Sequence, residues 1–432
     1  YLDDALSSDS RWGIAEVSLH SAGARDALAA QERLYTIAVI DAQPSYRVIG
    51  AIRDLLVAPE SPRAVLTRLS DPNVTLITAT VTEKGYCLTA DGSLDVAHPD
   101  VMHDLAHPAT PRSLVGYLVA GLALRREQHV AAPNIVSCDN LTDNGTRLRR
   151  AVVQFARERD SGLAQWIEDE VAFPRTMVDS ITPATDDALR ARVAEHLGVQ
   201  DRWPVQREAF TQWVIEDCLR APAPEWAALG ITITNDVAGF ERAKLRLLNG
   251  AHSSLAYLGT LAGHETVAQA MSDASLASFV RTLMTEDIAP TIVAPRGLDV
   301  SQYIESILQR FRNPALRHLL SQIAWDGSQK LPFRLFGTIR DVLEAGRPIE
   351  RLCLPVAAWF HFIRRKATKR ELAIDPVAPQ LLEIGAACTG EAKADVRAFL
   401  SLGSVFPAAL AGNAKFVAAL ERGYEVSANK VI

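Results

Sequence analysis

The chain has 432 residues, too many for one hydrophobic core, so its length predicts two domains. Hydrophobic residues make up 48% of it and charged residues 22%, as is typical of globular proteins. The formal net charge of -6 argues against nucleic acid or an anionic membrane as the main partner, so an anionic small substrate would need a local basic pocket. No apolar run approaches the roughly 20 residues of a membrane-spanning helix.

The cysteines and histidines indicate a compartment but no metal site. The five cysteines lie far apart, and none belongs to a CxxC or Cys/His cluster with zinc spacing. We interpret them as free or buried thiols of a protein in the reducing cytoplasm. Three histidines occur in "HPDVMHDLAHP" (residues 98–108), but the flanking prolines disfavour an ordered metal-binding helix.

The first ~140 residues alternate between strand-like and helix-like segments. Strands are predicted at residues 12–19, 35–42, 46–52, 74–86 and 134–140, the second and third as a hairpin pair. Helices are predicted at residues 24–34, 61–71 and 110–128, the last amphipathic with Pro111 near its first turn. This alternation indicates βαβ units and a mostly parallel sheet.

From Asn235 onward the apolar residues follow helical periodicity. The clearest segments are residues 275–293, 300–311, 315–324 and 348–367. We therefore predict an α/β fold with a Rossmann-like, mostly parallel sheet domain at residues 1–240. A mainly α-helical domain should follow at residues 241–432.

The expected opening of a dinucleotide-binding domain does not occur. Such a domain begins with a strand and a GxGxxG turn, and no GxGxxG is found here. Residues 1–10 are typical of the helix after such a turn, and residues 12–19 of the second strand. We expect that the first strand and the glycine-rich turn are missing from this chain, which should then bind NAD poorly.

Ligands on parallel sheets bind beyond the carboxyl ends of the strands. This rule places Thr82, Glu83, Asp139 and Asn140 at the expected site.

The stretch "KLRLLNGAHSSLAYLG" (residues 244–259) predicts a helix with unusual polar residues. Lys244 and His252 lie eight residues apart, near one face, and Asn249 precedes His252 by three. On an ideal helix Lys244 and Asn249 would point about 140° apart, so only the long lysine stem could bring them together. Gly250, which costs stability inside a helix, suggests a close packing or ligand contact. The alternative is an ordinary solvated helix face.

If these side chains converge, they suit hydride-transfer chemistry. A lysine whose pKa falls on burial can exchange a proton with an alcohol near neutral pH. An asparagine amide can donate to the oxygen that gains charge. His252 could hold the substrate or orient Lys244, and Asn140 could be a second donor. No metal would be needed.

The sequence resembles the polyol-specific long-chain dehydrogenase/reductase family over nearly its whole length. The resemblance is carried by "VTEKGYC" (81–87), "SCDNLTDNG" (137–145), "FPRTMVDSITP" (173–183), "QWVIED" (212–217), residues 244–259 and "DGSQKLPFR" (326–334). It implies an NAD-dependent oxidoreductase that acts on a sugar acid or polyol, as a monomer or weak homo-oligomer.

The resemblance also implies roles for individual residues. Lys244 would be the catalytic acid/base, Asn140 and Asn249 would hold the oxyanion, and His252 would contact the substrate. We therefore expect Asn140 to face Lys244 across an interdomain cleft.

Two carboxylates remain ambiguous. Asp179 would be a substrate-side acid, or simply cap a turn. Glu241 would lie near the proton path, or be a solvated surface group.

Substrate choice depends on finding a cation for a uronate carboxylate. The motifs are most similar to fructuronate reductases, and Gln322 stands where mannitol enzymes carry an arginine. Lys84, Arg317, Lys330 and Arg334 are the candidate cations, with Lys330 first, although each could be a solvated side chain.

The open hypotheses are D-fructuronate reduction to D-mannonate, D-fructose reduction to D-mannitol, and a non-catalytic scaffold. The missing turn favours the scaffold, and the intact catalytic residues oppose it. The predicted cofactor residues are Glu16, Thr82, Glu83, Lys84 and Asn140. Glu16 weakly favours NAD over NADP, because an acid there can bind a ribose hydroxyl and repel a 2′-phosphate.

Overall fold

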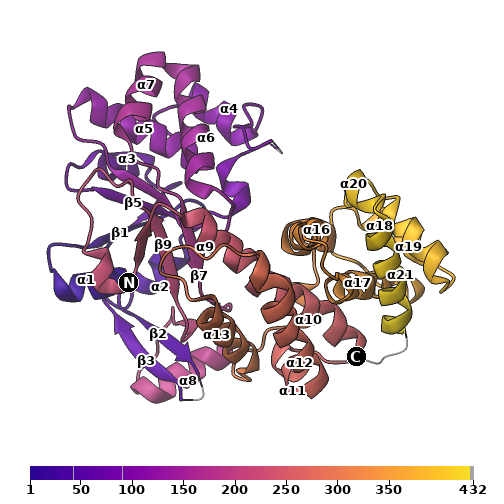
Figure 1. Cartoon of the computed structure of the whole chain (residues 1–432). Coiled ribbons are helices and arrows are strands. Elements are labelled where there is room, and N and C mark those ends of the chain that lie inside the picture. Colours follow the sequence, from indigo (N-terminus) through magenta and orange to yellow (C-terminus); the bar gives the residue numbers. More distant parts are fainter. Residues whose placement is uncertain (42, 90, 429–432) are drawn as a thin grey trace. The chain divides into compact units, whose positions relative to one another are not determined.

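The computed structural model describes residues 1–41, 43–89 and 91–428. Residue 42, the end of one predicted strand, lies outside this part. The chain divides into two compact units, Tyr1–Ala238 and Gly239–Ile432 (Figure 1).

Unit 1 (Tyr1–Ala238) contains short strands that are mostly parallel. The pairs β1–β4, β5–β6, β2–β8 and β9–β10 are parallel, and the pairs β2–β3 and β7–β9 are antiparallel. The predicted parallel sheet and hairpin are therefore confirmed. The strands are β1 Ile14–Ser18, β2 Tyr35–Ile40, β3 Ser45–Ile49, β4 Ile52–Val57, β5 Leu76–Ala79, β6 Asn134–Ser137, β7 Thr176–Asp179, β8 Val205–Glu208, β9 Gln212–Glu216 and β10 Thr232–Thr234.

Helices α5, α6 and α7 pack against one another and build the largest core of unit 1 together with β6 (Figure 1). Apolar residues on their contacting faces are removed from water, which is the main driving force for this packing. The α-helices are α1 Leu2–Ser8, α2 Gly23–Ala29, α3 Pro62–Ser70, α4 Pro99–Ala106, α5 Leu114–Glu127, α6 Asn144–Arg159, α7 Ser161–Glu170 and α8 Asp187–Leu197; the 3₁₀-helices are η1 Glu83–Tyr86 and η2 Trp226–Leu229.

Two predicted helix boundaries are wrong. α5 begins at Leu114 rather than near Pro111, because the Ser113 hydroxyl accepts the N–H of Gly116 and caps the helix. It is also buried on most sides rather than amphipathic. α2 ends at Ala29, because Glu32 and Arg33 adopt left-handed φ values of 55° and 65°.

The parallel sheet is interrupted between β1 and β5. Among the described residues, β1 pairs only with β4 and β5 only with β6. A cavity of about 560 Å³ is lined by consecutive residues of both segments, 12–17 and 73–81. Side chains on one face of a strand alternate, so a lining of consecutive residues means that the cavity follows the strand edges.

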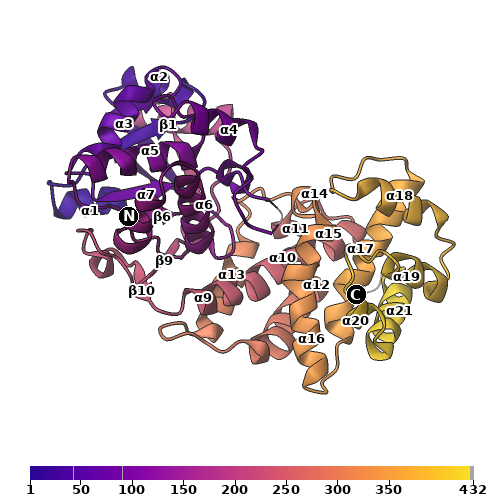
Figure 2. The same cartoon turned by 90° about the horizontal axis from the view of Figure 1, so that it is seen from above.

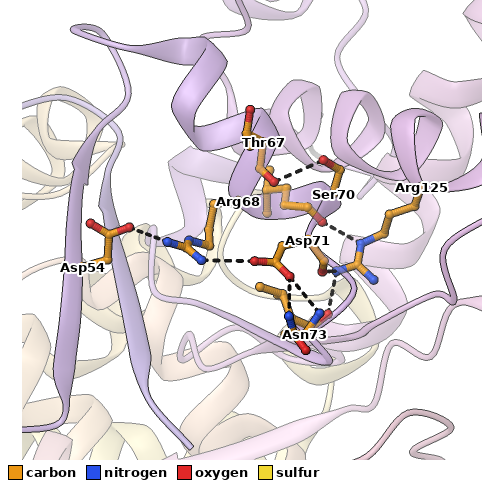
Figure 3. Close-up of polar contacts among 9 residues, drawn as sticks. Asp54, Thr67, Arg68, Ser70, Asp71, Asn73 and Arg125 are labelled. Carbon is orange, nitrogen blue, oxygen red and sulfur yellow. Dashed lines mark hydrogen bonds and ion pairs between the residues drawn. The ribbon is translucent and has the colours of Figure 1, made fainter. Parts of the chain in front are cut away.

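The buried guanidinium of Arg125 braces the connection between α3 and β5 (Figure 3). It donates to four backbone carbonyls, which belong to Leu69, Asp71, Val74 and Ala131, at 2.5 to 2.7 Å. Burial lowers its pKa. These carbonyls lie in the last turn of α3 or in the loops that follow helices, where they accept no hydrogen bond of a regular helix or sheet. The arginine therefore supplies the hydrogen bonds that buried carbonyls need.

Arg68 adds a second connection in the same region. It bridges Asp54 of β4 at 2.7 Å and Asp71 at 3.2 Å (Figure 3). Asp71 in turn accepts the backbone N–H of Asn73 at 2.9 Å, which shapes the turn before β5.

We predict that Arg125→Ala lowers the free energy of unfolding by about 2–4 kcal/mol, because it leaves buried carbonyls without donors. Arg126→Ala is the matched control. Arg126 forms an exposed pair with Asp160, so its loss should cost less than about 1 kcal/mol. Urea denaturation of both variants measures the difference. If both variants lose the same free energy of unfolding, the hydrogen bonds of Arg125 to buried carbonyls do not stabilise the fold.

Unit 2 (Gly239–Ile432) is mainly helical in its described part, as predicted, and α17 lies at its centre. α17 packs against α10, α18 and α21 (Figure 2). The elements, starting with the helix that spans the boundary, are α9 Val237–Ala243, α10 Gly250–Leu261, α11 Val267–Ser272, α12 Ala274–Thr282, α13 Val300–Arg312, α14 Leu320–Ile323, α15 Gly327–Leu331, α16 Gly337–Glu344, α17 Glu350–Thr368, α18 Ala378–Ala387, α19 Ala392–Leu400, α20 Ala408–Ala411 and α21 Ala414–Ala428, the π-helices η3 Lys244–Asn249, η4 Leu283–Ile288 and η6 Pro332–Phe336, and the 3₁₀-helix η5 Ala289–Thr291.

Aromatic side chains fill the centre of this unit. Phe360 of α17 stacks on Phe399 of α19 with ring centroids 4.3 Å apart, and Phe406 packs edge-on against Phe360. Such pairs add to the stability gained from burying their area.

The predicted helix at residues 315–324 is wrong in its first half. α13 ends at Arg312, where Pro314 follows Asn313, and the Asn313 side chain accepts the N–H of Ala315 in a turn. The chain then forms an isolated bridge between Thr266 and Leu319 before α14 begins. This loop carries His318.

Candidate active site

The helix that carries Lys244 changes its winding at that residue. α9 is followed by the π-helix η3, and α10 continues from Gly250. The Gly250 N–H donates to the carbonyl of Leu245, five residues earlier. In this winding residues five apart align along the axis, so Lys244 and Asn249 lie on the same side. The predicted separation of about 140° is therefore wrong, because it assumed α-helical winding.

Close packing accompanies the π-helix. A Cβ atom on Gly250 would lie 3.3 Å from the carbonyl oxygen of Arg334, so the glycine lets η6 approach. Arg246 anchors η3 by an ion pair with Asp341 at 2.7 Å and a hydrogen bond to the Thr291 hydroxyl at 2.9 Å. The predicted close contact at Gly250 is confirmed.

The side chains of this helix form a buried polar group. Lys244 is 8% exposed, Asn249 is partly buried and His252 is 6% exposed. The His252 ring stacks on Phe311 at 4.4 Å and meets His318 edge-on at 4.8 Å. No hydrogen-bond partner of His252 Nε2 occurs among the described residues.

Arg334 and Lys330 place positive charge beside this group. Arg334 donates to the Ser253 hydroxyl at 3.0 Å, and no carboxylate in the described chain lies within ion-pair distance of it. Lys330 donates from Nζ to the carbonyl of Ile323 at 3.3 Å. Burial lowers the pKa of both groups. The guanidinium of Arg334 therefore keeps N–H groups that can donate to an anion.

The same charges act on His252. Burial lowers its pKa well below the usual histidine value, and the nearby His318 and Arg334 lower it further, with smaller effects from Arg310 and Lys330. His252 is therefore neutral at physiological pH, able to donate from one ring nitrogen and accept at the other.

In unit 1 three of the predicted cofactor residues, Thr82, Glu83 and Lys84, lie in a strained loop after β5. Asp139 accepts the backbone N–H groups of Val81 at 3.0 Å and Thr82 at 2.8 Å, and the Tyr86 hydroxyl at 2.5 Å. Its carboxylate therefore fixes the loop after β5. Thr82 has φ 64°, a strained value for a threonine, and such strain concentrates at functional sites.

The other predicted cofactor groups lie at or near strand ends. Glu83 and Lys84 are exposed on η1, and Asn140 is exposed three residues after β6 ends. Glu16 is half-buried in the middle of β1 and lines the cavity beside β5. Burial raises its pKa, and its carboxylate accepts no hydrogen bond from a described residue.

Two predicted substrate-binding residues, Asp179 and Gln322, and the predicted proton-path residue, Glu241, lie on different elements. Asp179 is buried at the end of β7, Glu241 is partly buried on α9, and Gln322 is exposed on α14.

Sequence reasoning missed several members of the polar group in unit 2. Phe311, His318 and Ser253 contact the predicted residues, and Arg310 lies close enough to influence His252. The adjacent serine in "HSS" was the available signal for Ser253. His318 was hidden by the helical periodicity wrongly assigned to its loop.

The described residues contain neither a candidate metal site nor a candidate membrane-spanning helix. No group of three or more His, Cys, Asp or Glu side chains there could hold a metal ion. No helix there is long and apolar enough to cross a membrane.

Comparison with known protein families assigns both units. Residues 2–228 match the mannitol dehydrogenase Rossmann domain, and residues 236–427 match the mannitol dehydrogenase C-terminal domain. The chain belongs to the mannitol dehydrogenase family. The predicted fold class and the predicted dehydrogenase class are thereby confirmed.

Individual members of the mannitol dehydrogenase family are similar over most of their length. D-mannonate oxidoreductase of Escherichia coli (strain K12) is 40% identical over 97% of this chain and 87% of its own. A mannitol 2-dehydrogenase of Aspergillus fumigatus is 39% identical over 79% of this chain and 69% of its own. The solved Pseudomonas fluorescens mannitol 2-dehydrogenase, a ternary complex with NAD and D-mannitol, has a TM-score of 0.82 and 33% identity, and covers 100% of this chain and 89% of its own.

The buried neutral His252 predicts a pH dependence of stability in this mannitol dehydrogenase family member. Its folded pKa is depressed, so below about pH 6.5 the unfolded chain binds a proton that the folded chain does not. Stability should then fall as pH falls, by up to about 1.4 kcal/mol per pH unit for this group. Urea denaturation between about pH 7.5 and 5.5 should show a smaller loss for His252→Phe than for wild type. If the free energies of unfolding of wild type and His252→Phe change equally with pH, His252 is not a buried neutral group.

Proposed function

We propose that this chain is an NAD-dependent dehydrogenase that interconverts D-fructuronate and D-mannonate. The observation that carries the proposal is Arg334, partly buried without a carboxylate partner in the described chain and next to Lys330. Removing an unpaired charge from water costs several kcal/mol, so such an arrangement is favourable when an anion completes it. The carboxylate of a sugar acid is such an anion, and the 40% identity with a D-mannonate oxidoreductase agrees with it.

The catalytic roles follow from the chemistry of the side chains. In reduction, Lys244 gives a proton from Nζ to the oxygen that becomes the alcohol. The amides of Asn140 and Asn249 donate hydrogen bonds to that oxygen while it carries charge. The alignment of Lys244 with Asn249 on η3 supports this pairing. His252 holds a substrate hydroxyl.

Two carboxylates have supporting roles. Glu241 relays the proton between Lys244 and solvent. Asp179 binds the substrate, and Gln322, a neutral residue, leaves the recognition of the carboxylate to Arg334 and Lys330.

The cofactor is NAD, which accepts or supplies the hydride. Residues 1–240 form the cofactor-binding domain and residues 241–432 the substrate-binding domain. Glu16 fits a ribose, because its half-buried carboxylate faces the cavity and has a free acceptor oxygen. The strained loop with Thr82, Glu83 and Lys84, together with Asn140, lies where parallel strands bind ligands. We place the enzyme in the cytoplasm, as a monomer or weak homo-oligomer.

A second candidate is mannitol 2-dehydrogenase activity on a neutral ketose. The solved relative with D-mannitol favours it, since its fold and length match this chain closely. The two candidates differ in whether the substrate needs the cations beside His252, Arg334 and Lys330, for binding.

We predict that the enzyme reduces D-fructuronate with NADH at a kcat/KM at least about 100-fold above that for D-fructose. A neutral hexose would leave Arg334 unpaired, which is costly. Arg334→Met and Lys330→Met should each lower the value for D-fructuronate by about 10- to 100-fold and change that for D-fructose little. Steady-state kinetics with both ketoses measures this.

The control for this experiment is Arg312→Met, which removes an exposed positive charge from the end of α13. It should keep wild-type kinetics. A wild type that prefers D-fructose would transfer the assignment to mannitol 2-dehydrogenase.

We also predict that Lys244→Ala lowers kcat by roughly 10²–10⁴, the usual contribution of general acid–base catalysis. Lys369→Ala, which removes an exposed lysine from the end of α17, is the control and should have wild-type activity. Treatment with EDTA should leave the wild-type rate unchanged. Loss of activity in EDTA that zinc restores would refute the role of Lys244.

A further inference from the structure

Two buried histidine nitrogens lie close together without hydrogen bonds. Nε2 of His252 and Nδ1 of His318 are both inaccessible to solvent and have no partner among the described residues. Their rings meet edge-on, with centroids 4.8 Å apart and planes at 88°. The two unused nitrogens therefore belong to rings that are in contact with each other.

Such a pair is unfavourable in a folded protein by itself. Most buried polar atoms find a partner, and a buried atom without one costs free energy that a nonpolar side chain of similar shape would not. Here two segments distant in the sequence bring two such atoms to one place. This suggests that a ligand, rather than the fold, uses them.

The ring of His252 and the backbone of His318 are held in position by other contacts. His252 is stacked on Phe311 at 4.4 Å. The backbone of His318 is fixed because its carbonyl accepts the N–H of Val267 at 3.0 Å, next to the bridge between Thr266 and Leu319. The pair is therefore organised before any ligand arrives, which lowers the entropic cost of binding.

The chemistry of the pair selects one kind of partner. The free nitrogen of a neutral imidazole is a donor or an acceptor according to the tautomer, so two rings, one in each tautomer, can donate one hydrogen bond and accept another. A hydroxyl group matches this, since it donates and accepts at one oxygen. A carboxylate or a ketone only accepts. Burial lowers the pKa of both rings, and the nearby arginines lower it further, which keeps the rings neutral.

We propose that His252 and His318 together bind one hydroxyl group of the sugar substrate, one ring donating to its oxygen and the other accepting its proton. This inference rests on the proposed function and adds to it a substrate-binding residue, His318. The orientation of the hydroxyl beside Lys244 is then set by two rings instead of one.

A double-mutant cycle tests the proposal. His252→Phe and His318→Phe keep an aromatic ring and remove the nitrogens. Each should lower kcat/KM for D-fructuronate by about 10- to 100-fold and leave the KM for NADH unchanged. The double variant should lie within about threefold of the weaker single variant, because both changes remove binding of the same hydroxyl.

Thermal unfolding of the ligand-free variants gives an independent measurement. Each variant should have a Tm equal to or above that of wild type, because an unpaired buried nitrogen has been replaced by carbon. A histidine with a purely structural role would instead lower the Tm when replaced. His264→Phe, which changes a partly exposed histidine beside Asp273 in the same unit, is the control and should keep wild-type kinetics.

Three results would overturn the inference: wild-type kinetics in His318→Phe, losses that multiply in the double variant, or a marked fall in Tm. These outcomes are separable from failure of the proposed function. If wild type reduces D-fructose but not D-fructuronate, the proposed substrate is wrong, and the same cycle on D-fructose decides the hydroxyl contact. If wild type reduces neither ketose, both proposals are overturned.

Discussion

The π-helical winding at Lys244–Asn249 is the constraint on which the candidate active site depends. An α-helix would separate the lysine and the asparagine, whereas a bond spanning five residues aligns them. The winding is rare because it is less favourable than α-helix, and three features accommodate it here. Gly250 allows η6 to pack closely against the helix, and Arg246 of η3 binds Asp341 and Thr291. Two further π-helices, η4 and η6, pack against η3. The alignment of Lys244 with Asn249 is therefore a property of the packing in unit 2.

Charge gives this site its chemical character. The protein is acidic as a whole, yet Arg334, Lys330 and Arg310 gather around two neutral histidines in unit 2. Desolvated cations strengthen every interaction with an anion, because little water competes. The same desolvation keeps the imidazoles neutral, so in the proposed function the cations bind the carboxylate and the neutral rings bind a hydroxyl group of the same sugar acid.

The sequence predicted those features that repeat or that have specific motifs. α17 and the hairpin β2–β3 were visible because their apolar residues follow a regular period. The local winding at Lys244 was not visible, because six residues are too few to establish a different apolar period in the sequence. His318 was assigned to a helix because the apolar residues of 315–324 follow a helical period. The roles of Asn140, Asp179 and Glu241 stay predictions, because motifs name these residues but do not measure their effect on a substrate.

The most direct test of the account is the affinity of the enzyme, in the presence of its nicotinamide cofactor, for D-mannonate compared with D-mannitol. The two molecules differ at the carboxylate, so calorimetric titration isolates what the cations beside His252 contribute. The account predicts that D-mannonate binds at least about tenfold more tightly, since charge-assisted pairs with an arginine are strong. Equal affinities, or tighter binding of D-mannitol, would contradict a site built to receive a carboxylate.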